Sequence, residues 1–156
     1  MAAIAADTIN NYFELSRESI KKIERFGTNL QIIVPASTLL YSLYRKDYIG
    51  FGYMGLALIV NQVVIEVLKR LIPERRPNGN RLSFPSGHTM ATACGALSLI
   101  TRYGSSAPTI FIIAQCVSVG GVGLSRIIPK AHWVHDVAAG ALFGALLGSY
   151  LVPRFE

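Results

Sequence analysis

Charge is absent from much of this 156-residue sequence. Five stretches contain no Asp, Glu, Lys or Arg, and they span residues 26–44, 48–65, 82–101, 103–125 and 137–153. Each is close to the roughly 20 residues that a helix needs to cross about 30 Å of hydrocarbon. Five such stretches in so short a chain favour a membrane protein over a soluble helical bundle with buried apolar helices.

Cysteine is scarce too, and several sequence signals are missing. Cys94 and Cys116 both fall in apolar stretches, so we expect packing roles and neither a disulfide framework nor a metal site. No repeats or linkers are visible, which predicts a single domain over 1–156. The first residues show no basic region followed by an apolar core, so no cleavable signal peptide is predicted and we expect the N-terminus to be retained.

The predicted fold is an all-α, integral membrane helical bundle of about five transmembrane helices. The spans are expected near 28–45, 48–72, 86–102, 107–128 and 132–152, so that the bundle covers 28–152. Residues 7–25 predict an amphipathic helix, because Ile9, Phe13, Ile20 and Ile23 recur at helical spacing. Such a helix would lie in the headgroup plane and lead into the first span. The alternative is a solvated helix that packs on the protein's own loops.

Glycine recurs in the last predicted span at positions 140, 144 and 148. Small residues four apart lie on one face of a helix, where they let two helix backbones approach closely in a bilayer. We therefore expect this face to pack tightly against another helix.

The net charge of +6 does not indicate nucleic-acid binding. The basic residues are divided among short loops between spans, and attraction to anionic lipid headgroups explains them more simply.

Three short clusters of basic and histidine residues stand at the ends of predicted spans. They are Lys69 with Arg76, then 85–88 (Pro-Ser-Gly-His), then Ser125 and Arg126 followed by His132 and Asp136. Because successive spans alternate in direction, the four helix ends that carry these clusters should meet on one side of the membrane. Charged groups are costly near hydrocarbon, and a bound phosphate is the best reason to gather cations there.

The cations and the Pro-Ser-Gly-His segment predict two walls of a phosphate pocket. Lys69, Arg76 and Arg126 could surround a tetrahedral dianion. Ser86 suits a helix N-cap, and Gly87 would let a phosphate approach the free backbone N–H groups. Taken singly, each cation could instead extend toward lipid headgroups, and Ser86 could be only a cap.

His132 and Asp136 are four residues apart at the predicted start of the last helix, so they share a face. A carboxylate that holds one imidazole nitrogen leaves the other free to act as a nucleophile. The alternatives are a structural hydrogen bond, or an acidic residue placed to interact with the helix dipole. The neighbouring His135 is left outside the catalytic set.

These segments together resemble the tripartite signature of the type 2 phosphatidic acid phosphatase superfamily. The three motifs occur in the family's order and internal spacing over residues 69–136, and the apolar spans favour its membrane branch over soluble acid phosphatases and vanadium haloperoxidases. The resemblance implies that His132 forms a phosphohistidine and that Asp136 orients it. It also implies that His88 protonates the leaving oxygen and then activates water. The residues that it assigns to the phosphoryl oxygens are Lys69, Arg76, Ser86, Gly87 and Arg126, with Ser125 in support.

The sequence therefore predicts a metal-independent lipid phosphatase with no cofactor. No cluster of carboxylates is available in the motifs to hold a metal. The candidate substrates are bacterial envelope lipids: polyprenyl diphosphate, phosphatidylglycerol phosphate, phosphatidate or lipid A. Two alternatives stay open, a phosphotransferase that uses another hydroxyl in place of water, and a non-catalytic binder or transporter of anionic lipids. The oligomeric state is not predicted.

The expected location is a bacterial inner membrane. Counting cations by the positive-inside rule would place the motif face in the cytoplasm, but phosphate-binding residues and the N-terminal helix inflate that count. The resemblance implies an active site that faces the periplasm or exterior, and this is the orientation we expect.

Overall fold

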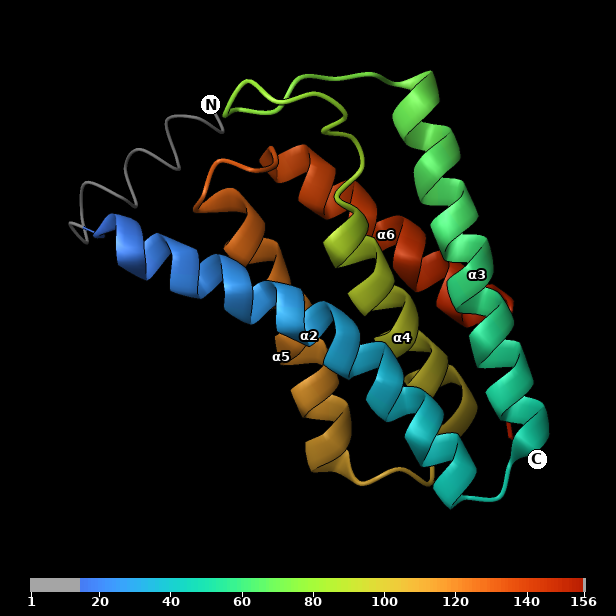
Figure 1. Cartoon of the computed structure of the whole chain (residues 1–156). Helices are drawn as coiled ribbons and strands as arrows, with labels where there is room; N and C mark the ends of the chain where they lie inside the picture. Colours follow the sequence, from blue (N-terminus) through green and yellow to red (C-terminus); the bar gives the residue numbers. More distant parts are fainter. Residues whose placement is uncertain (1–14, 156) are drawn as a thin grey trace.

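The described residues, 15–155 of a computed structural model, form five helices and no strand. The helices are α2 (Arg17–Tyr44), α3 (Tyr48–Leu71), α4 (Gly87–Tyr103), α5 (Thr109–Ile127) and α6 (Val134–Tyr150). In Figure 1 they form a bundle with α4 in the middle. The five expected spans therefore correspond to five helices, and the all-helical prediction is confirmed for this part of the chain.

Helix α2 corrects one expected boundary. The amphipathic segment 7–25 and the first span were expected as separate elements, but α2 continues unbroken from Arg17 to Tyr44. It starts at Ser16, whose hydroxyl accepts a hydrogen bond from the Ser19 N–H (3.1 Å). Gly27 lies within this helix and allows it to pack closely on α5, since a Cβ atom there would collide with Ser125. Residues 7–14 of the expected element lie outside the described residues.

Helix α4 is the core of the bundle, and α6 packs directly on its backbone. A Cβ atom on Gly140 would lie 2.6 Å from the Ser86 carbonyl oxygen, and one on Gly148 would lie 2.5 Å from that of Cys94. Gly144 similarly faces the backbone of Met90. Real Cβ atoms do not come this close, so only glycine permits the contact. The close approach predicted from the glycine spacing is confirmed.

Different interhelical turns lie at the two ends of the bundle. At one end, the N–H of Asn78 donates to the Lys130 carbonyl (3.1 Å), and the Trp133 indole N–H donates to the Arg75 carbonyl (2.8 Å). The α3–α4 loop therefore lies on the α5–α6 turn. At the other end, Arg45 donates to the Ser106 hydroxyl (3.1 Å), which joins the α2–α3 and α4–α5 turns. This arrangement agrees with the predicted alternation of the helices.

A buried ion pair closes the second end. Asp47 accepts hydrogen bonds from Arg102 Nε (2.6 Å) and from the Tyr103 hydroxyl (2.5 Å), and it caps α3 by accepting the Gly50 N–H (2.8 Å). Arg102 also donates to the Pro153 carbonyl (2.8 Å), which attaches the C-terminal segment. Asp47 and Arg102 lie 55 positions apart in the chain, and no pattern in the sequence analysis indicated this cluster.

Replacing Asp47 with asparagine should destabilise the protein by about 3 kcal/mol, because Arg102 would keep its charge in a buried site without a counterion. The Arg102 guanidinium, the Tyr103 hydroxyl and the Gly50 N–H hold the pKa of Asp47 well below its usual range. The stabilisation is thus fully present above the unfolded-state pKa of roughly 3.9 and is lost as the pH falls toward the native-state value.

Thermal unfolding in detergent between about pH 7 and pH 3 measures this effect. The difference in melting temperature between wild type and D47N should be large at neutral pH and should shrink as the solution is acidified. A constant difference over this range would show that the ionised carboxylate is not what stabilises this end.

Candidate active site

The three motif segments meet at one end of the bundle. The end of α3 approaches the start of α4: Lys69 Nζ lies 4.0 Å from the position that a Cβ atom on Gly87 would occupy. The start of α4 is in turn bonded to α6, because the Ser86 N–H donates to the Asp136 carbonyl (3.0 Å). Arg126 and His132 are joined through the turn between α5 and α6, where the His132 N–H donates to the Arg126 carbonyl (3.1 Å). The convergence predicted from the alternation of spans is therefore observed.

His132 and Asp136 form a buried imidazole–carboxylate pair. His132 Nδ1 lies 3.4 Å from Asp136 Oδ2, and the side chains are only 3% and 0% exposed. The same oxygen accepts hydrogen bonds from the Ser83 hydroxyl and from the Trp133 N–H (2.9 Å). Asp136 therefore caps the first turn of α6 and also lies next to His132, and its predicted role in orienting the ring stays a prediction.

Ser83 is a site residue that the sequence analysis missed. It is fully buried, and its hydroxyl donates to the carboxylate oxygen nearest His132. Its N–H donates to the Glu74 carbonyl (2.9 Å), and this hydrogen bond holds the two parts of the α3–α4 loop together. Ser83 stands two residues before the Pro-Ser-Gly-His segment, and nothing in its immediate sequence distinguishes it from other loop serines.

His88 lies in the first turn of α4, partly buried. It directly follows Gly87, which lies next to Lys69, and Ser86, whose N–H donates to the Asp136 carbonyl (3.0 Å). The second histidine therefore lies at the same end of the bundle as the predicted phosphate ligands and the predicted nucleophile. Its own carbonyl accepts a hydrogen bond from the Thr92 hydroxyl (2.8 Å), which is part of the helix.

Ser86 occupies the N-cap position of α4, as predicted, but its side chain does not cap a backbone N–H. The Ser86 and Thr89 hydroxyls share a hydrogen bond of 3.0 Å instead. The first N–H groups of α4 are left for another acceptor, which is the property expected of an anion-binding helix start.

The three predicted cations differ in how they are held. Lys69 and Arg76 are partly buried, and Arg76 Nε is a buried donor without a hydrogen-bond partner among the described residues. Arg126 is 3% exposed. Its Nη2 donates to the Glu24 carbonyl and, at 3.3 Å, to the Thr28 hydroxyl, and its Nε donates to Ser125 (3.1 Å).

Arg126 therefore differs from the simple expectation of a free phosphate ligand. A guanidinium carries five N–H donors, and those of Nη1 make no hydrogen bond within the described part of the chain. Helix α2 fixes one side of the group and leaves the other side for an anion. Ser125 supports this geometry, as the family resemblance implied.

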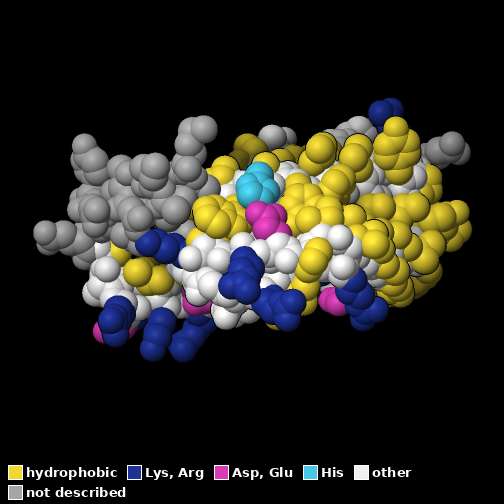
Figure 2. Space-filling model, turned by 90° about the horizontal axis from the view of Figure 1, so that it is seen from above, with side chains coloured by type: hydrophobic (Ala, Val, Ile, Leu, Met, Phe, Trp, Pro, Cys, Tyr) yellow, Lys and Arg dark blue, Asp and Glu magenta, His cyan; other side chains and the backbone are white. Residues whose placement is uncertain are grey.

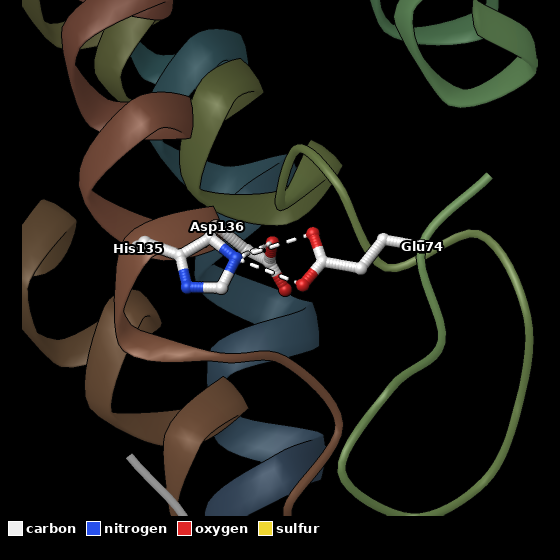
Figure 3. Close-up of side chains that lie close together, drawn as sticks. All are labelled: Glu74, His135 and Asp136. Carbon is white, nitrogen blue, oxygen red and sulfur yellow. Dashed lines mark hydrogen bonds and ion pairs between the residues drawn. The ribbon is translucent and has the colours of Figure 1, made fainter. Parts of the chain in front are cut away.

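Glu74, His135 and Asp136 lie together at the surface of the site (Figure 3). His135 Nε2 is 3.0 Å from Glu74 Oε1 and 3.3 Å from Asp136 Oδ1, and its ring is stacked on Trp133. In the described part of the chain, these are the residues whose donor atoms could together hold a divalent cation. His135 lies against Asp136 Oδ1, whereas His132 lies against Oδ2, so a cation there would share the carboxylate with His132.

Comparison with known proteins gives the family. Residues 78–155, half of the chain, match the model of the PAP2 superfamily. The chain belongs to the PAP2 superfamily. The match includes His88, Arg126, His132 and Asp136, whereas Lys69 and Arg76 precede it, so their place in the site rests on the geometry described above.

Two curated relatives are similar to this PAP2 chain. It is 33% identical to phosphatidylglycerophosphatase B of Bacillus subtilis, in an alignment that covers 72% of this chain and 61% of the relative. It is 33% identical to lipid A 1-phosphatase of Porphyromonas gingivalis, in an alignment that covers 64% of this chain and 25% of the relative. The chain thus spans less than two thirds of the length of either relative.

Two crystal structures have a similar fold. That of LpxE from Aquifex aeolicus superimposes with a TM-score of 0.75 at 21% identity, over 94% of this chain and 92% of the other. The first transmembrane PAP2-type phosphatidylglycerolphosphate phosphatase from Bacillus subtilis gives a TM-score of 0.71 at 26% identity, over 96% and 80%. The described bundle is therefore close to a whole PAP2 fold.

Proposed function

We propose that this PAP2 protein is a membrane lipid phosphatase that removes phosphate from a lipid headgroup through a phosphohistidine on His132. The observation that carries the proposal is the buried His132–Asp136 pair, which lies at the same end of the bundle as His88 and the three cations. A protein that only bound or transported anionic lipids would need the cations but would have no use for an oriented imidazole. The relatives named above are phosphatases of lipid headgroups by their names, which supports the same class.

In the first step, His132 Nε2 attacks the phosphorus atom, and the bond from phosphorus to the lipid oxygen breaks. Asp136 Oδ2, 3.4 Å from Nδ1, favours the tautomer with the proton on Nδ1 and the lone pair on Nε2, and the carboxylate stabilises the positive charge that develops on the ring. The leaving oxygen takes a proton from His88, in the first turn of α4. Ser83 and the Trp133 N–H keep the carboxylate in position during the transfer.

In the second step, water replaces the lipid. His88, now without its proton, accepts one proton from a water molecule, and the oxygen of that water attacks phosphorus as the bond to Nε2 breaks. Inorganic phosphate leaves, and both histidines return to their starting states. If a second lipid or sugar hydroxyl took the place of water, the same residues would perform phosphotransfer.

The phosphoryl oxygens are bound by Lys69, Arg76, Arg126 and the start of α4. The unpartnered Arg76 Nε and the unused Arg126 Nη1 are donors available to a dianion. A Cβ atom on Gly87 would lie 3.3 Å from Ile65 and 4.0 Å from Lys69 Nζ, so a larger residue there would crowd the lysine. Fixed positive groups aimed at the transferring phosphoryl group supply the main stabilisation of the transition state.

A membrane location follows from what the bundle exposes. Large apolar side chains point outward from α2, α3, α5 and α6, including Ile32, Ile59, Ile113 and Leu142, each at least 50% exposed. Polar residues such as Asn61 and Gln115 are buried instead. Helices α3 and α5 are long and apolar enough to cross a membrane by themselves. We propose that all five helices cross it, and that the site faces the periplasm or exterior of a bacterial inner membrane.

The basic residues suit a site end that lies at the level of the lipid headgroups, on whichever side of the membrane it faces (Figure 2). Figure 2 looks down on the end that carries the site loops, and it shows Lys and Arg gathered along one edge with hydrophobic side chains over much of the rest. Such a basic rim at the membrane surface would attract an anionic headgroup.

Single-cysteine labelling should place the two ends of the bundle on opposite sides of the membrane. In a variant without Cys94 and Cys116, a membrane-impermeant reagent should label Gly79→Cys from outside intact cells and Lys46→Cys only after permeabilisation. Labelling of both positions from the same side would contradict the model, and reversed labelling would place the site in the cytoplasm.

A turnover assay on a panel of lipid phosphates tests the function itself. Polyprenyl diphosphate, phosphatidylglycerol phosphate, phosphatidate and lipid A share the phosphate that the site recognises, so we expect release of inorganic phosphate from at least one. Phosphate labelled in the substrate would appear in a second lipid or sugar if the protein were a phosphotransferase. Binding without turnover of any substrate would leave only the lipid-binding alternative.

Removal of divalent metal should leave this activity within about twofold of the untreated protein. The proposed chemistry takes its positive charge from Lys69, Arg76 and Arg126, which do the work that metal ions do in many phosphoryl-transfer enzymes. The measurement is turnover before and after dialysis against chelator. Loss of activity that added magnesium restores would overturn the mechanism, even for a protein that is a phosphatase.

A further inference from the structure

An apolar groove runs between α5 and α6 on the outside of the bundle. It has a cavity volume of about 360 Å³, within the size range of small-ligand sites. Leu124 and Ile127 of α5 line one side, Val134 and Ala141 of α6 line the other, and Thr89 of α4 lies at the bottom. Its lining is almost entirely apolar, so it suits hydrocarbon and not a headgroup.

Small residues keep the groove open. A Cβ atom on Gly120 would meet nothing within 4 Å, so the space beside α5 is empty at this position. Ala138 and Ala141 face it from α6. Gly123 allows the two helices to meet below the groove, because a Cβ atom there would lie 2.8 Å from Val137. Larger residues at Gly120 or Ala141 would therefore fill the groove.

The groove is continuous with the catalytic end of the bundle. Thr89 shares its hydrogen bond with Ser86, at the start of α4 beside Lys69 and His88. Ile127 directly follows Arg126 in the chain, and Val134 is two residues after His132. From these residues the groove passes along α5 to Gly120 and along α6 to Ala141, away from the site loops.

We propose that this groove receives a hydrocarbon chain of the lipid phosphate while its headgroup occupies the active site. The inference rests on the proposed function, and it specifies which pair of helices admits the lipid. A substrate that presents phosphate to His132 must place its chain somewhere along the bundle, and the groove offers an apolar path that begins at the site. Seating the chain there fixes the position of the phosphate relative to the nucleophile.

The effect of filling the groove should be mainly steric. A chain that leaves the bilayer for the groove gains little hydrophobic free energy, since lipid tails are as apolar as the groove. A blocked groove would instead displace the headgroup, and small displacements of reacting atoms are costly to catalysis. The turnover of substrates without a hydrocarbon chain should not change when the groove is filled.

The test compares G120L and A141L with wild type on dihexadecanoyl phosphatidate in mixed micelles and on para-nitrophenyl phosphate. We expect kcat/KM for phosphatidate to fall about tenfold or more and that for the soluble ester to stay within twofold. The matched control is G52L on α3, where a Cβ atom also meets nothing within 4 Å and no groove is filled. It should leave both substrates unaffected.

The outcomes separate the inference from the function on which it rests. Unchanged phosphatidate kinetics in both groove variants would overturn the inference alone. If another lipid phosphate of the panel is the better substrate, the comparison is made with that lipid, and a wild-type protein that hydrolyses none of them would overturn the proposed function and the inference with it. Equal loss on both substrates would mean that the variants disturb the site, and it would count against a groove that acts only on the chain.

Photolabelling gives a readout that does not depend on substituted residues. Phosphatidate with a diazirine at mid-chain should label peptides that cover 119–127 and 134–141 of the wild-type protein, and excess unmodified phosphatidate should suppress this labelling. Labelling of the groove that phosphatidate does not displace would show that bulk membrane lipid fills it, which would overturn the inference.

Discussion

Replacing His132 with alanine is expected to lower turnover by roughly 10⁴-fold or more and to eliminate the phosphorylated form of the protein. The reason is that the side chain supplies the only proposed bond to phosphorus. It is 3% exposed and is held 3.4 Å from Asp136 Oδ2, so no neighbouring group can take its place without rebuilding the site. Rapid quenching with substrate labelled in the phosphate measures both effects.

The chemistry of the trapped species identifies the residue type. A phosphohistidine is labile in acid and stable in base, whereas phosphoserine and acyl phosphates behave differently. We expect such an adduct in wild type and none in H132A. In H88A, formation of the adduct should slow, but its hydrolysis should slow as well, so a substrate with a good leaving group should let it accumulate.

His135→Ala is the matched control for the loss of an imidazole. His135 lies three residues from His132 on the same helix start, but it is exposed and pairs with Glu74. We expect H135A to keep the phosphoenzyme and to lose less than about tenfold in turnover, because it contacts Asp136 only from the outer side. A phosphoenzyme that survives in H132A and disappears in H135A would show that His135, and not His132, is the nucleophile.

The helices and their order could be predicted because charge-free length is a strong local signal. The expected spans at 48–72 and 107–128 differ from α3 and α5 by no more than two residues at either end. The glycine spacing in α6 also predicted a specific contact, because the close approach of two helix backbones depends mainly on the absence of a side chain. Alternation of the helices then placed the motifs at one end without any knowledge of their side-chain contacts.

The boundary inside α2 could not be predicted from the same signal. The change from charged to apolar residues near Arg25 looked like a change of element, but charge content does not interrupt a helix. Gly27, which could mark a break, is used where α2 meets Ser125 of α5. That contact joins residues about a hundred positions apart, and no local pattern indicates it.

The partners of the site residues could not be predicted for a similar reason. The carbonyl that accepts a hydrogen bond from Arg126 belongs to Glu24, and because every residue has a backbone carbonyl, the residue type does not indicate this contact. Ser83 and Asp47 act through short hydrogen bonds to Asp136 and Arg102, which follow from tertiary packing alone. Motif spacing therefore located the reacting groups, whereas the groups that hold them required the structure.

Changing Asp136 to asparagine is expected to lower turnover by roughly 10³–10⁴-fold while the fold is kept. The amide oxygen of asparagine can still accept the Trp133 N–H and the Ser83 hydroxyl, so the start of α6 retains its cap. What it loses is the negative charge beside His132 Nδ1. The ring then has less support for its developing positive charge and no longer favours the tautomer with the lone pair on Nε2.

Asp47→Asn is the matched control for D136N, because it removes the same charge from a second buried carboxylate at the far end of the bundle. It should lower the melting temperature but leave the turnover of the folded protein within about twofold, whereas D136N should do the reverse. Phosphoenzyme formation measured on protein verified to be folded separates the two. Near-normal formation in D136N would mean that Asp136 only caps α6, and His132 would then need no carboxylate to attack phosphorus.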